Sequence, residues 1–217
     1  MANGWTKLYG HTVTSGEAGT STILDTGTIS GTWDSLKIVI DVVQHSSDEC
    51  VPSIYFNDDR VQQYPIKRNS DFSDGSTSND SGFSTTYYAN YAGYGGDAKR
   101  LCIYDIANHA GHEKLITWQQ IISGSNPSMN VGCGKYCGSS GNPALAITKV
   151  HIASFNINDG SSTGTQYFGE GTKVTVFGAG DGTTTNYYPN LPKGTIFEEQ
   201  DTGKHYMFDG TSAWNEV

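Results

Sequence analysis

The chain has 217 residues, of which 16% are charged and 35% hydrophobic, with 13 Lys and Arg against 22 Asp and Glu. The resulting net charge of −9 at pH 7 argues against a nucleic-acid partner, because binding a phosphate backbone requires clustered Lys and Arg. The low charge, the 27 glycines and the 13 tyrosines favour turn-rich β-structure, and no long segment has the apolar spacing of an amphipathic helix.

The beginning of the chain is polar, since Asn3, Gly4, Thr6 and Lys7 follow soon after Met1. A signal peptide needs a basic segment followed by an apolar one, and a membrane-spanning helix needs about 20 apolar residues. Neither pattern is present in the sequence. We therefore expect a protein that is made in a cytoplasm, without a signal peptide and without membrane insertion.

The first segments predict strands. Residues 5–9 predict an edge strand or an arm that packs on a neighbour, and residues 21–27 predict a second strand. Two β-branched runs follow, at residues 36–43 and 51–57, with apolar side chains at alternating positions. A short polar connection separates these two runs. We expect them to form a hairpin in the middle of one sheet.

Residues 58–85 form the longest polar stretch, and they predict a functional or mobile loop. Its acidic part, from Asp71 to Asp80, lacks the glycine and glutamate positions of a calcium-binding hand. A tyrosine-rich segment follows. Its members are ordinary sheet residues in one interpretation and an interface or ligand surface in the other, because tyrosine buries a large area and keeps a polar group. They are Tyr87, Tyr88, Tyr91 and Tyr94.

Four more strands are predicted after the tyrosines, at residues 100–107, 114–122, 144–156 and 172–177. Turn-forming residues separate them, as in antiparallel all-β domains. Together with the earlier strands they predict an all-β fold, an antiparallel β-sandwich in residues 1–177, for which a jelly roll is the preferred topology.

The C-terminal part has a different composition. Residues 178–190 are rich in Gly and Thr and predict a linker, and residues 191–217 predict a small three-stranded β-meander with Gly-containing turns. So small a unit has little core and is expected to dock on something. Its aromatic residues Tyr206, Phe208 and Trp214 are therefore candidate interface residues.

Several short motifs match catalytic patterns only in their letters. Gly160 to Gly164 fits G-x-S-x-G and Gly93 to Ala98 fits a relaxed dinucleotide fingerprint, but neither precedes a predicted helix. His109 and His112 lie on either side of Gly111 and predict a solvated loop. We expect no catalytic, cofactor-binding or metal-binding residues and no enzymatic activity.

The cysteines leave two alternatives. Cys133 and Cys137 are close enough in sequence for a local disulfide in an oxidising compartment, and two free thiols are equally compatible with the pattern. A zinc site would need two more ligands at recognisable spacing. Cys50 and Cys102 are predicted as buried strand residues.

Three segments and one tyrosine carry a resemblance to a known group of proteins: Trp33–Ile40, Ile54–Asp59 and Ala146–Ile152, with Tyr64. They resemble virion proteins of tailed phages and related viruses, over roughly residues 20–177. The segments 191–199 and 205–215 resemble a short C-terminal module that recurs on marine viral structural proteins. This resemblance implies a β-sandwich component of a capsid, tail or spike, located in the virion and often oligomeric. It supplies no catalytic residues.

Two functions follow as hypotheses. The first is a non-enzymatic viral structural protein, a capsid-decoration, tail or spike component that acts through contacts with itself, as a homo-oligomer with a trimer favoured, and with other virion proteins. The second is a carbohydrate-binding or adhesive module, in which the tyrosines from Tyr87 to Tyr94 and the neighbouring acidic loop bind host-surface glycans.

Overall fold

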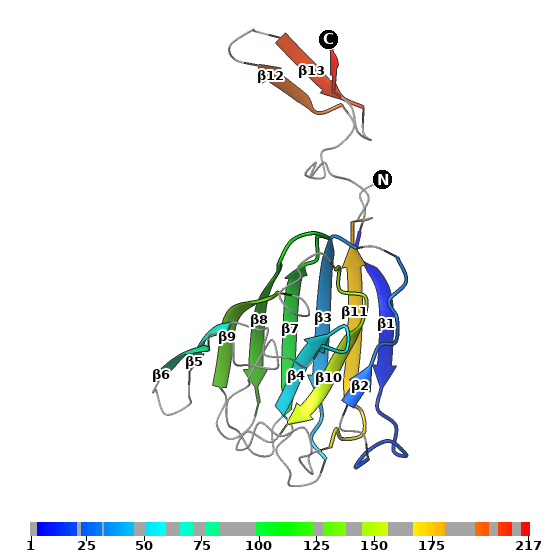
Figure 1. Cartoon of the computed structure of the whole chain (residues 1–217), viewed down its shortest axis with the longest axis vertical. Coiled ribbons are helices and arrows are strands. Elements are labelled where there is room, and N and C mark those ends of the chain that lie inside the picture. The colour runs from blue at the N-terminus through cyan, green and yellow to red at the C-terminus, as the bar shows by residue number, and fades with distance from the viewer. Residues whose placement is uncertain are drawn as a thin grey trace.

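The computed structural model describes residues 4–20, 23–31, 33–45, 51–59, 66–71, 77–82, 99–123, 128–137, 145–155, 167–180, 194–199, 204–209 and 214–217. These residues form strands and turns, and every strand pairing among them is antiparallel (Figure 1). No helix in the described residues is long and apolar enough to cross a membrane. The all-β antiparallel prediction is confirmed.

The strands form one large sheet and two small ones. The large sheet has eight strands, which in spatial order are β1 (Thr6–Thr12), β11 (Lys173–Ala179), β3 (Ser35–Val42), β7 (Arg100–Ala107), β8 (Lys114–Ile122), β9 (Ser128–Tyr136), β5 (Ile66–Asp71) and β6 (Thr77–Gly82). The second sheet has three strands, in the order β2 (Ile23–Asp25), β10 (Val150–Phe155) and β4 (Val51–Phe56). The third sheet is the C-terminal meander of β12 (Ile196–Glu199), β13 (Lys204–Phe208) and β14 (Trp214–Glu216).

The second sheet lies across one face of the large sheet, which makes the sandwich (Figure 1). Burial along β8 alternates strictly from Lys114 to Ile122, because successive side chains of a strand point to opposite faces. The same alternation runs along β3 and β7. The inward residues of these strands pack with those of β4 and β10 in one core, which includes Leu36, Ile38, Ile40, Tyr104, Ile116, Trp118, Ile54, Phe56, Val150 and Ile152.

The expected central hairpin is wrong. The two runs do form strands, β3 and β4, but β3 pairs with β11 and β7 in the large sheet, whereas β4 pairs with β10 in the second sheet. The chain therefore crosses from one layer of the sandwich to the other between these strands. Both strands keep their apolar pattern, because each buries one face in the shared core.

Three strands of the large sheet fall where no strand was predicted. β5 and β6 pair with each other inside the expected long polar loop, and β9 joins β5 to β8. The segment from Asp71 to Asp80 is therefore not one loop, since it includes the end of β5 and most of β6. The sequences of β5 and β6, IKRNSD and TSNDSG, are held in the sheet by backbone hydrogen bonds and carry almost no apolar side chains.

Other predicted elements are confirmed within small shifts of their ends. β1 is an edge strand of the large sheet, β7 and β8 have the predicted bounds, and β10 is shorter than predicted. β11 continues to Ala179, past the predicted end of the sandwich at residue 177. The three-stranded meander is present, with β13 between β12 and β14, and most of the predicted linker at 178–190 lies outside the described residues.

Buried polar side chains join the loops at one end of the sandwich. Asn108, which is 2% exposed, donates to the backbone oxygens of Trp33 and Ile147 and accepts from the Ile147 N–H at 2.6 Å. The hydroxyl of Tyr136 donates to Asp59 Oδ2 at 3.0 Å. Because a buried polar group without a partner is costly, these bonds fix how the loops meet the strands.

Candidate functional site

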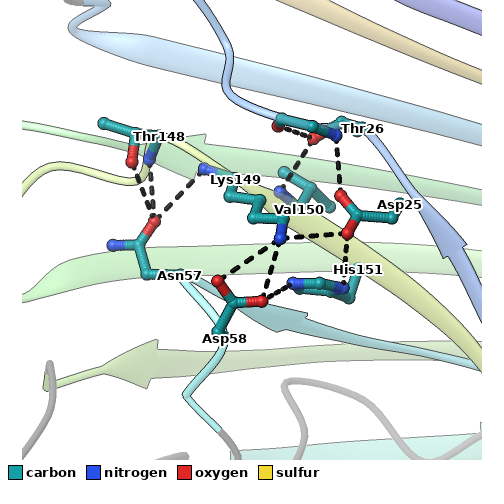
Figure 2. A network of polar contacts seen from close by, with 9 residues as sticks. Asp25, Thr26, Asn57, Asp58, Thr148, Lys149, Val150 and His151 are labelled. Atoms are coloured by element: carbon teal, nitrogen blue, oxygen red, sulfur yellow. Dashed lines mark hydrogen bonds and ion pairs between the residues drawn. The ribbon is translucent and has the colours of Figure 1, made fainter.

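Four polar side chains meet at one end of the second sheet, and we call them the Asp–Lys–His cluster: Asp25, Asp58, Lys149 and His151. Asp25 ends β2, Asp58 lies in the turn after β4, and Lys149 directly precedes β10 (Figure 2). His151 lies in β10, where its register partners are Asp25 on β2 and Tyr55 on β4. The sheet pairing therefore brings three separate segments of the chain to one point.

The cluster is tightly connected. Lys149 Nζ lies 3.0 Å from Asp25 Oδ2 and 3.0 Å from Asp58 Oδ1. His151 Nε2 lies 2.7 Å from Asp58 Oδ1, and its Nδ1 lies 3.6 Å from Asp25 Oδ2. The short Nε2 contact is not aligned as a hydrogen bond. The imidazole ring stacks on Tyr55, with the ring centroids 4.3 Å apart.

The turn after β4 holds Asp58 in place. Asn57 and Asp58 have φ values of 52° and 59°, in the left-handed region that Asn and Asp tolerate better than most residues. The Asn57 side chain accepts from the backbone N–H groups of Thr148 and Lys149 (Figure 2). Its amide nitrogen donates to the backbone oxygen of Ala146. These bonds fix the turn against the segment that enters β10.

The charges shift one another's protonation. Burial tends to raise the pKa of Asp25, but the Gly27 N–H, Lys149 and His151 outweigh it and hold that pKa below its usual value. The hydrogen bond from Lys149 is the largest cause that lowers the pKa of Asp58. The hydrogen bonds to Asp25 and Asp58 raise the pKa of Lys149. Both carboxyl groups are thus kept ionised and the amine is kept charged.

Asp25, Asp58 and His151 also present possible metal-ligand atoms, which lie within 4.8 Å of one another. However, the Lys149 ammonium contacts both carboxylates and supplies the positive charge that a metal ion would bring. A metal ion would have to displace this lysine and overcome its repulsion. The donor set therefore fits an internal ion-pair network better than a metal centre.

The geometry of the cluster does not favour acid–base catalysis. The ring of His151 is only 6% exposed, and both of its nitrogens face carboxylates. Nearby hydroxyls serve the backbone, because Thr26 Oγ1 donates to the Gly27 oxygen and accepts from the Val150 N–H. The arrangement holds charge in place and clamps three segments together.

A second feature lies on the far side of the large sheet, on the face opposite the core. We call it the outer apolar strip, and it follows two cross-strand rows over four strands. The first row crosses β7, β8 and β9 at Leu101, Ile121 and Met129. The second row crosses β3, β7, β8 and β9 at Val39, Ile103, Gln119 and Val131, of which only Gln119 is polar. Leu101, Ile121 and Met129 are 38%, 53% and 46% exposed.

Most of the predicted interface residues stay untested. The four tyrosines from Tyr87 to Tyr94 lie outside the described residues. In the meander, Tyr206 is half-buried and Trp214 begins β14, where it pairs with Phe208. Phe208 is 4% exposed, so its side chain is covered by its own chain.

Cys133 and Cys137 are free thiols in this structure. Cys133 lies in the extended strand β9 and Cys137 directly follows it. Four steps of an extended chain span about 13 Å, whereas disulfide-linked Cα atoms lie within about 7 Å. Burial raises the pKa of the Cys137 thiol, which disfavours a reactive thiolate. Cys102 is buried as predicted, and Cys50 lies outside the described residues.

His109 and His112 lie in the turn between two strands of the large sheet, and each has its own local partner. The turn that carries them joins β7 to β8, and their backbone oxygens both accept from the buried ammonium of Lys114. The imidazole of His109 lies 3.5 Å from Asp34, and that of His112 contacts the backbone oxygen of Ala110. Burial lowers the pKa of Lys114.

Comparison with known proteins gives no relative. No family model matches the chain, and neither the curated proteins nor the solved structures contain a match.

The Asp–Lys–His cluster was not predicted from the sequence. Asp58 was identified only as the start of the polar stretch at residues 58–85, and Lys149 and His151 only as part of the predicted strand at residues 144–156. The signal that could have indicated the cluster is a charged residue at the end of three strands: Asp25 ends β2, Asp58 follows β4 and Lys149 precedes β10. Without the strand pairing, nothing in the sequence joins Asp25 to residues more than 120 positions away, at β10.

Proposed function

We propose that this protein is a non-enzymatic structural subunit of the virion type, a capsid-decoration, tail or spike component, and that it acts by binding further copies of itself. The observation that carries the proposal is the outer apolar strip. Monomeric proteins rarely leave a contiguous apolar surface of this kind open to water, and such patches mark interaction sites.

The position of the strip supports a protein partner rather than a structural role within the sandwich. The inner face of β7 and β8 already supplies the core, so Leu101 and Ile121 do not contribute to it. Large aliphatic side chains on a solvent-facing sheet cost little stability while they are exposed and gain by association. Their burial by a second sheet face is the geometry that joins two β-sheets in a sandwich.

The charge distribution favours a second copy as the occupant. The whole chain carries a net charge of −9, which opposes self-association at most surfaces. The two rows contain no charged side chain, and the first row is bordered at each end by an acidic register partner, Asp41 beside Leu101 and Asp71 beside Met129. Two copies can therefore meet face to face at the strip with their charges at the rim.

The virion setting rests on the resemblance of the sandwich and the C-terminal meander to viral structural proteins. The all-β sandwich is the fold that this resemblance implies. The meander supports the same proposal, because three short strands have little core of their own and two apolar side chains, Ile196 and Met207, are paired and 60% and 38% exposed. We propose that the meander contacts a neighbouring subunit.

The test is the mass of the full chain in solution, measured by light scattering after size exclusion. We expect a closed oligomer for the wild type. Ile121→Thr, alone and combined with Leu101→Thr, should shift it toward monomer, because threonine retains the β-branched shape but removes apolar surface. Thr117→Ser is the matched control, since Thr117 is an exposed residue of the same strand and face outside the strip.

A wild-type chain that stays monomeric at high concentration would contradict the proposal, as would an oligomer that the Ile121→Thr and Leu101→Thr changes leave intact. The same measurement on a chain without residues 183–217 tests the meander. An assembly that dissociates on this truncation supports the role of the meander in subunit contact, and an unchanged assembly assigns the contact to the strip alone.

A further inference from the structure

An open groove lies on the outer face of the large sheet, the same face that carries the outer apolar strip. The groove lies near the first residues of β3 and β8 and the last residues of β7, and the strip lies toward the other end of these strands. Its volume is about 310 Å³. The residues that decide its shape and chemistry are Trp5, Ser35, Asp105, Ala107, Leu115 and Thr117. A volume of this size is at the lower end of the range for small-molecule sites.

The groove exists because a row of small side chains crosses the sheet. Ser35 on β3 is the register partner of Ala107 on β7, and Ala107 is the partner of Leu115 on β8. Trp5, just before β1, forms one wall, and Leu115 forms the other. Both wall residues are large and exposed, Trp5 at 48% and Leu115 at 60%. The floor is therefore low and the walls are apolar.

The next cross-strand row gives the groove a polar side. Asp105 and Thr117 are register partners, and Asp105 pairs with Lys37 at 3.0 Å. The Lys37 ammonium lies 5.4 Å from the centre of the Trp5 ring, so a cation–π contact holds the indole near the ion pair. The carboxylate of Asp105, which accepts hydrogen bonds, and the hydroxyl of Thr117, which both donates and accepts, thus line one edge of the groove, and the Lys37 ammonium lies beside that edge in its ion pair with Asp105.

We propose that this groove binds a pyranose ring of a carbohydrate. One face of a pyranose presents C–H groups that pack on the exposed indole of Trp5, and its edge presents hydroxyls that match Asp105, Lys37 and Thr117. A purely apolar ligand would remove water from the Lys37–Asp105 pair without replacing its hydrogen bonds, which is unfavourable. An anionic ligand would meet the carboxylate of Asp105.

The probes are methyl glycosides of glucose, galactose, mannose and N-acetylglucosamine and their β-linked oligomers, titrated against the full chain and followed by NMR. We expect at least one of them to bind. Trp5→Ala should weaken that binding at least tenfold, because buried aromatic anchors dominate such contacts. Asp105→Asn should weaken it less, since the amide keeps one acceptor oxygen. Trp5→Phe, which keeps an aromatic face, should restore part of it.

Gln119→Ala is the matched control, because Gln119 is exposed on the same face of β8 but does not line the groove. Thermal unfolding of each variant shows whether the sandwich is intact. Absence of binding for every glycoside, or binding that Trp5→Ala and Asp105→Asn leave unchanged, overturns the proposal. Ile121→Thr should leave binding intact, which separates this site from assembly through the outer apolar strip.

Discussion

The two faces of the large sheet carry similar residue types and behave differently. On β8, Ile116 points to the inner face and is 1% exposed, whereas Ile121 points to the outer face and is 53% exposed. The inner face packs against the second sheet in one continuous core. The outer face has a strip of aliphatic residues, in which Leu101, Ile121 and Met129 are 38%, 53% and 46% exposed, and a groove beside Trp5. Hydrophobic composition alone therefore does not tell which face of a strand is the core.

The largest expected effect is a direct comparison of the two isoleucines. Ile116→Ala should lower the free energy of unfolding by about 2–5 kcal/mol, because it leaves a cavity in the core. Ile121→Ala should change it by less than about 0.5 kcal/mol, as expected for an exposed position. Urea unfolding of both variants under conditions that keep the chain monomeric makes the measurement. Equal effects would show that the outer face is also a core.

A second comparison adds a methyl group to the inner face, whereas Ile116→Ala removes side-chain atoms from it. A Cβ on Gly132 would overlap the ring of Trp118, which is buried and donates to Asn130 Oδ1. Gly132→Ala should therefore destabilise the fold by about 1–3 kcal/mol through overpacking. Gly16→Ala is the control, since open space surrounds Gly16. A neutral Gly132→Ala would mean that Trp118 moves freely.

A smaller effect is expected at the polar border of the inner face. Tyr136→Phe removes the hydroxyl that donates to Asp59 Oδ2 at 3.0 Å, in a buried setting. The loss should be about 0.5–2 kcal/mol, the usual range for one buried hydrogen bond. Thermal unfolding of this variant and of Thr117→Ser, on the outer face, gives the comparison. A variant as stable as the wild type would show that the bond only orients the turn.

The smallest effect concerns the Asp–Lys–His cluster and depends on pH. The pKa values of Asp25 and Asp58 are lowered in the fold, so their contribution is complete above their ordinary value of 3.8 and is lost as the pH falls below it. The pKa of Lys149 is raised, so its contribution is present below 10.5 and is lost as the pH rises beyond that value. Around neutral pH all three contributions are complete, so the titration of these groups should not make stability depend on pH there.

Lys149→Met tests this dependence. Without the ammonium, the pKa values of the two carboxyl groups should return toward their ordinary value, and the acid loss of stability should become shallower. Urea unfolding at pH 7 and pH 3 measures the difference. Lys204→Met removes a lysine from another exposed ion pair, with Glu216, and serves as the control. An acid loss that is equally steep in wild type and Lys149→Met would assign it to other groups.

Sequence reasoning succeeded where a strand carries a regular apolar pattern. β7 and β8 were predicted with the observed bounds, because the alternation of their side chains is a local property. It failed for β5, β6 and β9, which contain Gly and polar residues and join the sheet through backbone hydrogen bonds. It also failed for the pairing of β3 and β4, since two strands with the same pattern fit a hairpin and a crossover equally well.

Composition and periodicity were enough to predict the all-β class, the apolar strands of the core and the C-terminal meander, because both are local and act before any long-range contact forms. The three-dimensional fold was needed to show which strands share a sheet, which apolar face stays open, and that Asp25, Asp58, Lys149 and His151 meet. Those outcomes depend on pairing between segments far apart in the chain, and that pairing is selected by burial of the whole core rather than by any one segment.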